Sequence, residues 1–152
     1  MDRKKIIFSF LYFFVFCILA SAQDSEDLKY KITPTINKES PSGVYIPKDL
    51  EECFKELKTM LQPSLVAEMK AKPEKEMIGY HHGLGMWIRN NWGLWSDSRL
   101  KKYFNNLGIR HPDDMSSIIL NSFWRHLHNQ LLELDRQIKY YQEYWENVKK
   151  QK

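Results

Sequence analysis

The sequence predicts a mainly α-helical fold: a single compact bundle of about five helices with a long C-terminal helix, preceded by a polar arm. Three observations predict it. Apolar residues recur at helical spacing through most of residues 48–148, proline or glycine separates successive helical stretches, and only residues 30–32 suggest a short strand. We therefore expect one α-helical domain over residues 45–150.

The first residues are typical of a secretory signal peptide. Three basic residues precede an apolar run over residues 6–19, and a small-x-small cleavage motif ends at Ala22. A membrane-spanning helix needs roughly 20 apolar residues, so an uncleaved anchor is the less favoured alternative. We expect removal of residues 1–22, export to the periplasm or the medium, and no stable membrane span afterwards.

The net charge bears on whether the protein binds nucleic acid, and the cysteine content on whether it forms disulfides. Removal of residues 1–22 lowers the formal net charge from +4 to +2, because that segment carries three basic residues and one acidic residue. A charge this small, without a clustered Lys/Arg face, argues against nucleic acid as a partner. Cys53 is then the single cysteine, and its spacing from Leu50 and Leu57 predicts a buried, inert thiol, with a reactive thiol or an intermolecular disulfide as the alternative.

Helical stretches are expected to follow one another after a polar segment. Residues 23–44 are polar and broken by proline and glycine, which predicts a linker or a disordered arm. The expected helices cover residues 48–62, a short segment capped by Ser64 that ends before Pro73, the helical spacing of residues 73–91, the stretch SRLKKYFNNLG capped by Ser96 or Asp97, and a segment that begins at Pro112.

The last predicted helix has the most regular pattern in the chain. Its apolar residues recur in alternating steps of four and three: Leu120, Trp124, Leu127, Leu131, Leu134, Ile138, Tyr141, Trp145 and Val148. This series, the heptad seam, predicts one helical face that packs on another helix. The flanking positions lack the alternating Glu and Lys of coiled coils, which favours packing within the protein over a homodimer or a heteromeric coil.

A tryptophan-rich stretch, HHGLGMWIRNNWGLW at residues 81–95, is the candidate site. Gly83 and Gly85 in this stretch, like Gly79 just before it, would each cost about 1 kcal/mol in a helix, which indicates close approach by another element. Polar and aromatic side chains mix here, as in a recognition surface or a buried hydrogen-bond network. The candidate binding residues are His82, Arg89, Asn90, Asn91, Trp92, Trp95 and Arg99.

Two acids open the helix that begins at Pro112. Asp113 and Asp114 lie in its first turn, where negative charge suits the helix dipole. They are also candidates for a structural pair with Arg89 across a helix junction.

The sequence contains no strong catalytic, metal or cofactor motif. The side chains of adjacent His81 and His82 diverge by about 100° on a helix, so they do not form the paired ligands of a metal site. A tertiary site that combines one of them with His111 and Asp113 is an alternative. We expect no metal, no cofactor and no catalytic residue.

Two stretches, IPKDLEECFKELKTML and HHGLGMWIRNNWGLWSDSRLKKYFNNLGIRHPDDMSSIIL, resemble a bacterial family classed as a domain of unknown function and seen in exported proteins of Bacteroidetes-type bacteria. The resemblance covers roughly residues 46–144, and GLGMWIRNNWGLW with HPDDMS is its most specific part. It implies one domain that contains both pieces. It implies no activity or cofactor.

The sequence favours binding over catalysis. We expect an envelope binding module that recognises another protein or an envelope ligand, with Arg89, Trp92, Trp95 and Arg99 as the strongest contacts.

Two alternative functions remain. One is a small envelope hydrolase acting on glycan or peptide, with His82 or His111 and an acid among Asp97, Asp113 and Asp114. The other is a structural protein that self-associates through the heptad seam.

Overall fold

The computed structural model describes residues 30–151. Within this range six α-helices, one 3-10 helix and one π-helical turn share one core, and the only β pairing is an isolated antiparallel bridge between Ile36 and Val44. The mainly α-helical fold with a long C-terminal helix is confirmed. The signal peptide expected at residues 1–22 lies outside the described residues.

The first two helices lie close to their expected positions. Helix α2 (Leu50–Met60) begins after Asp49, whose side chain accepts a hydrogen bond from the backbone N–H of Glu52 at 2.9 Å. Helix α3 (Pro63–Ala71) begins at the proline that separates the two. Cys53 is fully buried on α2, and burial raises the pKa of its thiol, which fits the inert thiol predicted for it.

The helical stretch over residues 74–91 changes its winding twice. It consists of a 3-10 helix η1 (Glu74–Tyr80), a π-helical turn η2 (His81–Gly85) and helix α4 (Met86–Asn91). A Cβ atom at Gly83 would overlap the Tyr30 ring, and one at Gly85 would lie 3.5 Å from Leu120 on the next long helix. Gly83 and Gly85 therefore lie where another part of the chain packs closely, as the sequence indicated.

Helix α5 (Arg99–Asn106) begins one or two residues later than predicted. Ser98 is the cap, and its Oγ accepts a hydrogen bond from the backbone N–H of Lys101 at 3.1 Å. The expectation of Ser96 or Asp97 as the cap was wrong. Gly93, with φ of +68°, lets the chain turn before the helix.

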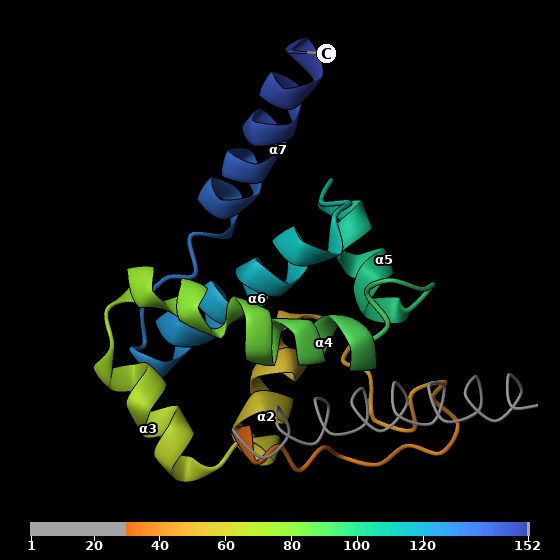
Figure 1. The fold of residues 1–152 in the computed structure, drawn as a ribbon, viewed down its shortest axis with the longest axis vertical. Helices are drawn as coiled ribbons and strands as arrows, with labels where there is room; N and C mark the ends of the chain where they lie inside the picture. The colour runs from red at the N-terminus through yellow and green to blue at the C-terminus, as the bar shows by residue number, and fades with distance from the viewer. Residues whose placement is uncertain (1–29, 152) are drawn as a thin grey trace, which may run out of the picture.

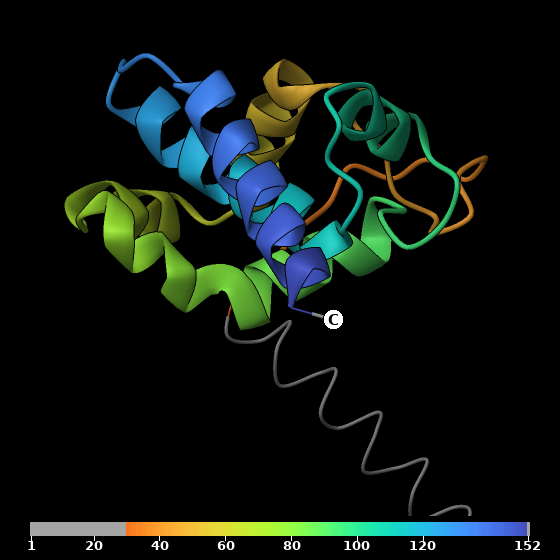
Figure 2. The same cartoon turned by 90° about the horizontal axis from the view of Figure 1, so that it is seen from above.

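Helix α6 (Pro112–Leu127) is the centre of the fold and contacts every other helix and helical turn named here (Figures 1 and 2). Pro112 is its first residue, as predicted, and His111 precedes it as the cap.

The heptad seam does not form one continuous helix, so that prediction was wrong. The chain leaves the helix after Leu127, and helix α7 (Leu134–Lys150) begins only after a turn in which Asn129 and Glu133 adopt left-handed φ angles of 53° and 49°. Asparagine tolerates this conformation better than most residues. No proline or glycine in residues 128–133 marks the break.

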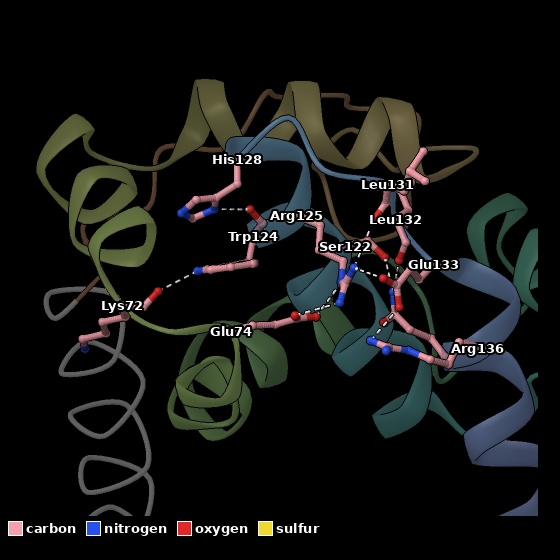
Figure 3. Close-up of polar contacts among 11 residues, drawn as sticks. Lys72, Glu74, Ser122, Trp124, Arg125, His128, Leu131, Leu132, Glu133 and Arg136 are labelled. Carbon is pink, nitrogen blue, oxygen red and sulfur yellow. Dashed lines mark hydrogen bonds and ion pairs between the residues drawn. The ribbon is translucent and has the colours of Figure 1, made fainter.

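Arg125 holds the turn between α6 and α7 (Figure 3). Its Nη1 donates to the Leu131 carbonyl oxygen at 3.1 Å and lies 3.0 Å from Glu133. Its Nε and Nη2 bind both carboxylate oxygens of Glu74 at 2.6 and 2.8 Å. One buried guanidinium thus connects η1, α6 and the turn that redirects the chain.

The seam residues pack mainly against their own chain. Leu120 is buried in the core, and Leu134, Ile138 and Tyr141 of α7 pack partly buried against it. Leu131, in the turn, is 84% exposed. Helix α7 crosses α6 (Figure 2) and extends beyond the rest of the domain at its C-terminal end (Figure 1).

The segment expected as a linker or disordered arm is described from residue 30 onward, and residues 30–44 lie against the helices. Tyr30 and Val44 are buried, the backbone N–H of Thr33 donates to the Met60 carbonyl oxygen at 2.8 Å, and the Ser42 hydroxyl donates to the Asn91 carbonyl oxygen at 2.6 Å. A few apolar side chains and turn hydrogen bonds hold this polar stretch on α2 and α4. Within residues 30–151, no helix is both long and apolar enough to cross a membrane.

Candidate functional site: a buried network and an aromatic pocket

A buried ion pair joins α4 to the first turn of α6. Arg89 Nε lies 3.1 Å from Asp113 Oδ1, and Arg89 Nη1 donates to Ser116 Oγ at 2.8 Å and to the His81 carbonyl oxygen at 3.3 Å. Of the two acids considered as partners for Arg89, Asp113 therefore takes the role. Because the guanidinium is almost fully buried, these contacts fix α6 against the π-helical turn.

His81 lies between Ser117 and Asp113. Its Nδ1 is 3.1 Å from Ser117 Oγ, and its Nε2 is 3.4 Å from Asp113 Oδ1. Desolvation and the positive charge of Arg89 lower the pKa of His81, which favours the neutral imidazole. His81 and Ser117 also line a cavity of about 360 Å³ between η1, α6 and α7. The three side chains have the hydroxyl–imidazole–carboxylate order that activates serine nucleophiles.

A second cavity lies on the other side of α7, between that helix and the loop from α5 to α6. Its volume is about 540 Å³. We call it the Trp145 pocket, and its lining residues are Gly108, Ile109, Arg110, His111, Asp114, Tyr141, Gln142, Trp145, Glu146 and Lys149.

Aromatic rings form a continuous group at this pocket. The ring centroids of His111 and Trp145 are 5.3 Å apart, Trp95 packs edge-on to His111 at 6.3 Å, and Tyr144 packs edge-on to Trp145 at 5.3 Å. Trp95 is 56% exposed and extends this aromatic surface beyond the pocket. Rings with polar edges at a partly open pocket are typical of ligand-binding surfaces.

Asp114 is the buried acid of the Trp145 pocket. It is only 9% exposed, and its Oδ2 accepts a hydrogen bond from Trp145 Nε1–H at 2.7 Å. Burial raises the pKa of Asp114, although the Trp145 hydrogen bond opposes the shift. Among residues 30–151, no Lys or Arg lies within ion-pair distance of Asp114, whereas the adjacent Asp113 is paired with Arg89.

The predicted binding residues do not lie together on one face of the protein. Arg89 and Trp92 are buried, because Arg89 pairs with Asp113 and the Trp92 side chain, 1% exposed, lies in the core. These two residues do not belong to a binding surface. Asn91 is half-buried and its side-chain amide donates to the Trp87 carbonyl oxygen at 2.9 Å.

The remaining predicted residues are exposed but separate. His82 is exposed and packs edge-on to His81 at 5.3 Å. Asn90 and Arg99 line a different cavity of about 570 Å³ beside residues 37–46, where Arg99 Nε donates to the Ile46 carbonyl oxygen at 2.6 Å. Trp95 alone of the predicted set adjoins the Trp145 pocket.

Sequence reasoning missed Tyr141 and Trp145 as site residues because both belong to the heptad seam, which predicted packing only. One signal could have found them. Two of the three seam residues after Ile138 are Tyr141 and Trp145, whose rings carry polar groups that suit partly exposed positions.

The residues expected for a hydrolase do not come together as predicted. His82 points away from the network and His81 takes its place, while Asp97 pairs with Lys102 at 3.3 Å on the surface. His111 Nδ1 lies 3.2 Å from Asp113 Oδ2. In the described part of the chain, no group of three or more His, Cys, Asp or Glu residues is placed to hold a metal ion.

Comparison with known protein families identifies the family of this chain. Residues 46–127 match the family described as a domain of unknown function, DUF6794. The chain belongs to this family. The DUF6794 match begins at the expected residue 46 but ends with α6 at residue 127, before the expected end near residue 144. It includes His81, Arg89, Asp113 and Asp114 but not α7. No curated protein and no solved structure matches the chain.

Proposed function

We propose that this DUF6794 protein is an exported binding module of the cell envelope, and that its ligand binds in the Trp145 pocket. One observation carries the proposal: a pocket of about 540 Å³ that combines aromatic rings with a buried carboxylate. Small-molecule and peptide-anchor sites typically have volumes of roughly 300–1,000 Å³, apolar walls and a few placed polar groups. The cavity has this composition and size.

The envelope location is supported by the signal-peptide pattern of residues 1–22. Export would place the pocket where it meets envelope proteins and ligands. Mass spectrometry of the protein purified from a cell fraction tests this part of the proposal. The expected chain begins at Gln23, and an intact chain in the cytoplasm would contradict the location.

Site-specific photo-crosslinking tests the pocket directly. We would place the crosslinking residue p-benzoylphenylalanine at Gln142, which lines the pocket, and in a matched variant at Tyr140, which is 64% exposed on α7 and lines none of the three cavities. Illumination of intact cells should give a crosslinked product from position 142 and none from position 140. Equal products, or none from position 142, would overturn the proposal.

Ester or peptide hydrolysis is a second candidate function, favoured by the contacts of His81 with Ser117 and Asp113. Ser117 Oγ would attack a carbonyl carbon while His81 Nδ1 takes the hydroxyl proton and returns it to the leaving group; water would then release the acyl group. Two features weigh against this candidate. Ser117 lies within α6, where backbone N–H groups donate along the helix and not to an oxyanion, and Asp113 already binds Arg89.

A fluorophosphonate probe distinguishes the two candidates. An activated Ser117 would form a covalent adduct that is lost in Ser117→Ala and retained in Ser116→Ala. If the protein is a binding module only, neither the wild type nor the variants react.

A further inference from the structure

The charge distribution in the Trp145 pocket indicates which ligand group it accepts. Asp114 Oδ2 accepts the hydrogen bond from Trp145, and within residues 30–151 the second oxygen, Oδ1, has no hydrogen-bond partner and is open to solvent. A buried carboxylate is costly unless a cation or several donors satisfy it. Within residues 30–151 the protein supplies one N–H donor to Asp114 and no Lys or Arg at ion-pair distance; the imidazoles of His111 and His81 are the basic groups that act on it.

The aromatic groups around Asp114 suit the same kind of ligand. The Trp145 indole, whose N–H binds Asp114, lies beside the His111 ring at 5.3 Å, and Tyr141 forms another part of the wall. Aromatic faces attract ammonium and guanidinium groups, and the attraction grows when the cation is removed from water. A carboxylate and aromatic faces together therefore select a cation over a neutral or acidic group.

The charged residues at the pocket edge add a second requirement. Arg110 and Lys149 are exposed and line the pocket together with Glu146. Their long side chains can donate to carbonyl oxygens, while solvent screens their repulsion of a cation bound near Asp114. A basic side chain within a peptide supplies both the cation and the flanking carbonyl oxygens.

We propose that the Trp145 pocket binds a lysine side chain of a partner peptide, with the ammonium group on Asp114 Oδ1 and against the Trp145 ring. This inference rests on the binding function proposed above and specifies its ligand. The ammonium group would complete the hydrogen bonding of Asp114, and Arg110 and Lys149 would donate to the peptide backbone.

Titration of the full-length mature chain with blocked tripeptides tests the inference. The probe is acetyl-Gly-Lys-Gly-amide, and the control is the same peptide with norleucine, which keeps the aliphatic chain and lacks the charge. Binding is followed by the backbone and indole N–H signals in ¹H–¹⁵N spectra at low ionic strength. The lysine peptide should bind about tenfold more tightly than the norleucine peptide, since a charge-assisted hydrogen bond is lost in the control.

Variants locate the binding group. Asp114→Asn keeps the shape and an oxygen acceptor for Trp145 but removes the charge, so it should weaken lysine-peptide binding about tenfold. Glu143→Gln is the matched control, because Glu143 is an exposed acid of α7 that does not line the pocket; it should change affinity less than about twofold. The spectrum of each variant verifies its fold.

Three results would overturn the inference: equal binding of the two peptides, no binding of the lysine peptide, or unchanged affinity in Asp114→Asn. If the crosslink from position 142 forms despite any of them, the pocket still binds a ligand and only the lysine assignment is wrong. If the crosslink is also absent, the proposed binding function fails as well.

Discussion

At the residue scale, burial separates two adjacent acids into different roles. Asp113 is paired with Arg89 and holds α6 against the π-helical turn, whereas Asp114 lies in the Trp145 pocket without a cation from the described chain. The sequence placed both acids in the first turn of the helix, and either could have paired with Arg89. Only the rotation of α6 relative to α4 decides between them, and that rotation depends on the whole core.

Arg89→Ala should strongly destabilise the protein. The substitution leaves Asp113 and Ser116 without their buried donor, and we expect the free energy of unfolding to fall by about 2–3 kcal/mol, allowing for the partial exposure of Asp113. Arg99→Ala is the control, because Arg99 also contacts a carboxylate, Glu52, at 3.3 Å but is exposed. It should cost less than about 1 kcal/mol. Urea unfolding measures both, and equal losses would contradict the structural role of Arg89.

Asp114→Asn should have the opposite effect on stability at neutral pH. Burial raises the folded-state pKa of Asp114 above its ordinary value of 3.8, so the ionised carboxylate opposes folding above that folded-state pKa. We expect the variant to be more stable than the wild type by about 0.5–2 kcal/mol at pH 7.

This stability difference should depend on pH in one direction. As the pH falls through the raised folded-state pKa towards 3.8, Asp114 becomes protonated in the folded wild type and the advantage of the variant should shrink. Urea unfolding at pH 7 and pH 4 measures it. A variant that is less stable at pH 7 would show that the carboxylate supports the fold and is not held for a ligand.

At the element scale, the sequence predicts the helix starts better than the helix breaks. Pro112 begins α6 as expected, because proline suits the first helical turn. Pro63 begins α3 after Gln62, one residue before Ser64, the cap expected from the sequence. The break between α6 and α7 depends on Arg125, which replaces helical hydrogen bonds with contacts to Leu131 and to distant Glu74. A partner 51 residues away in the sequence gives no local signal.

Arg125→Lys should loosen the attachment of α7. Lysine cannot bind both oxygens of Glu74 and the Leu131 carbonyl at once, so we expect a loss of about 1–3 kcal/mol in unfolding free energy. Amide hydrogen exchange in α7 should become faster. Arg136→Lys, at an exposed arginine that also contacts Glu133, should change stability by less than about 0.5 kcal/mol. Unchanged exchange in Arg125→Lys would show that the turn holds without this guanidinium.

The π-helical turn determines which of the two adjacent histidines contacts Asp113 and Ser117. Two adjacent histidines on a helix point in different directions, and the pattern alone does not tell which one faces the core. The widened turn at residues 81–85 brings His81 to Asp113 and Ser117 and leaves His82 exposed. The Tyr30 ring packs so close to Gly83 in this turn that a Cβ atom would overlap it, a contact with no local signal in the sequence.

At the scale of the whole molecule, the candidate site forms where the family domain meets a helix beyond the family match. The DUF6794 match ends at residue 127 and supplies His111 and Asp114, while α7 supplies Tyr141 and Trp145. Periodicity predicted that α7 would be helical and would pack inward. Periodicity could not predict the pocket, because a pocket forms where the side chains of two neighbouring elements leave space between them. That space depends on the three-dimensional packing.

The five tryptophans of this protein allow the central claim, that the Trp145 pocket is the binding site, to be tested in one measurement. The measurement is a ¹H–¹⁵N spectrum of the indole N–H groups of the mature protein, recorded with and without detergent extract of the producing cell's envelope. We predict a shift or loss of the Trp145 signal, a smaller change at neighbouring Trp95, and unchanged signals from buried Trp92 and from Trp124, whose N–H donates to the Lys72 carbonyl oxygen at 2.7 Å. A Trp145 signal that stays unchanged while another tryptophan responds would contradict the claim.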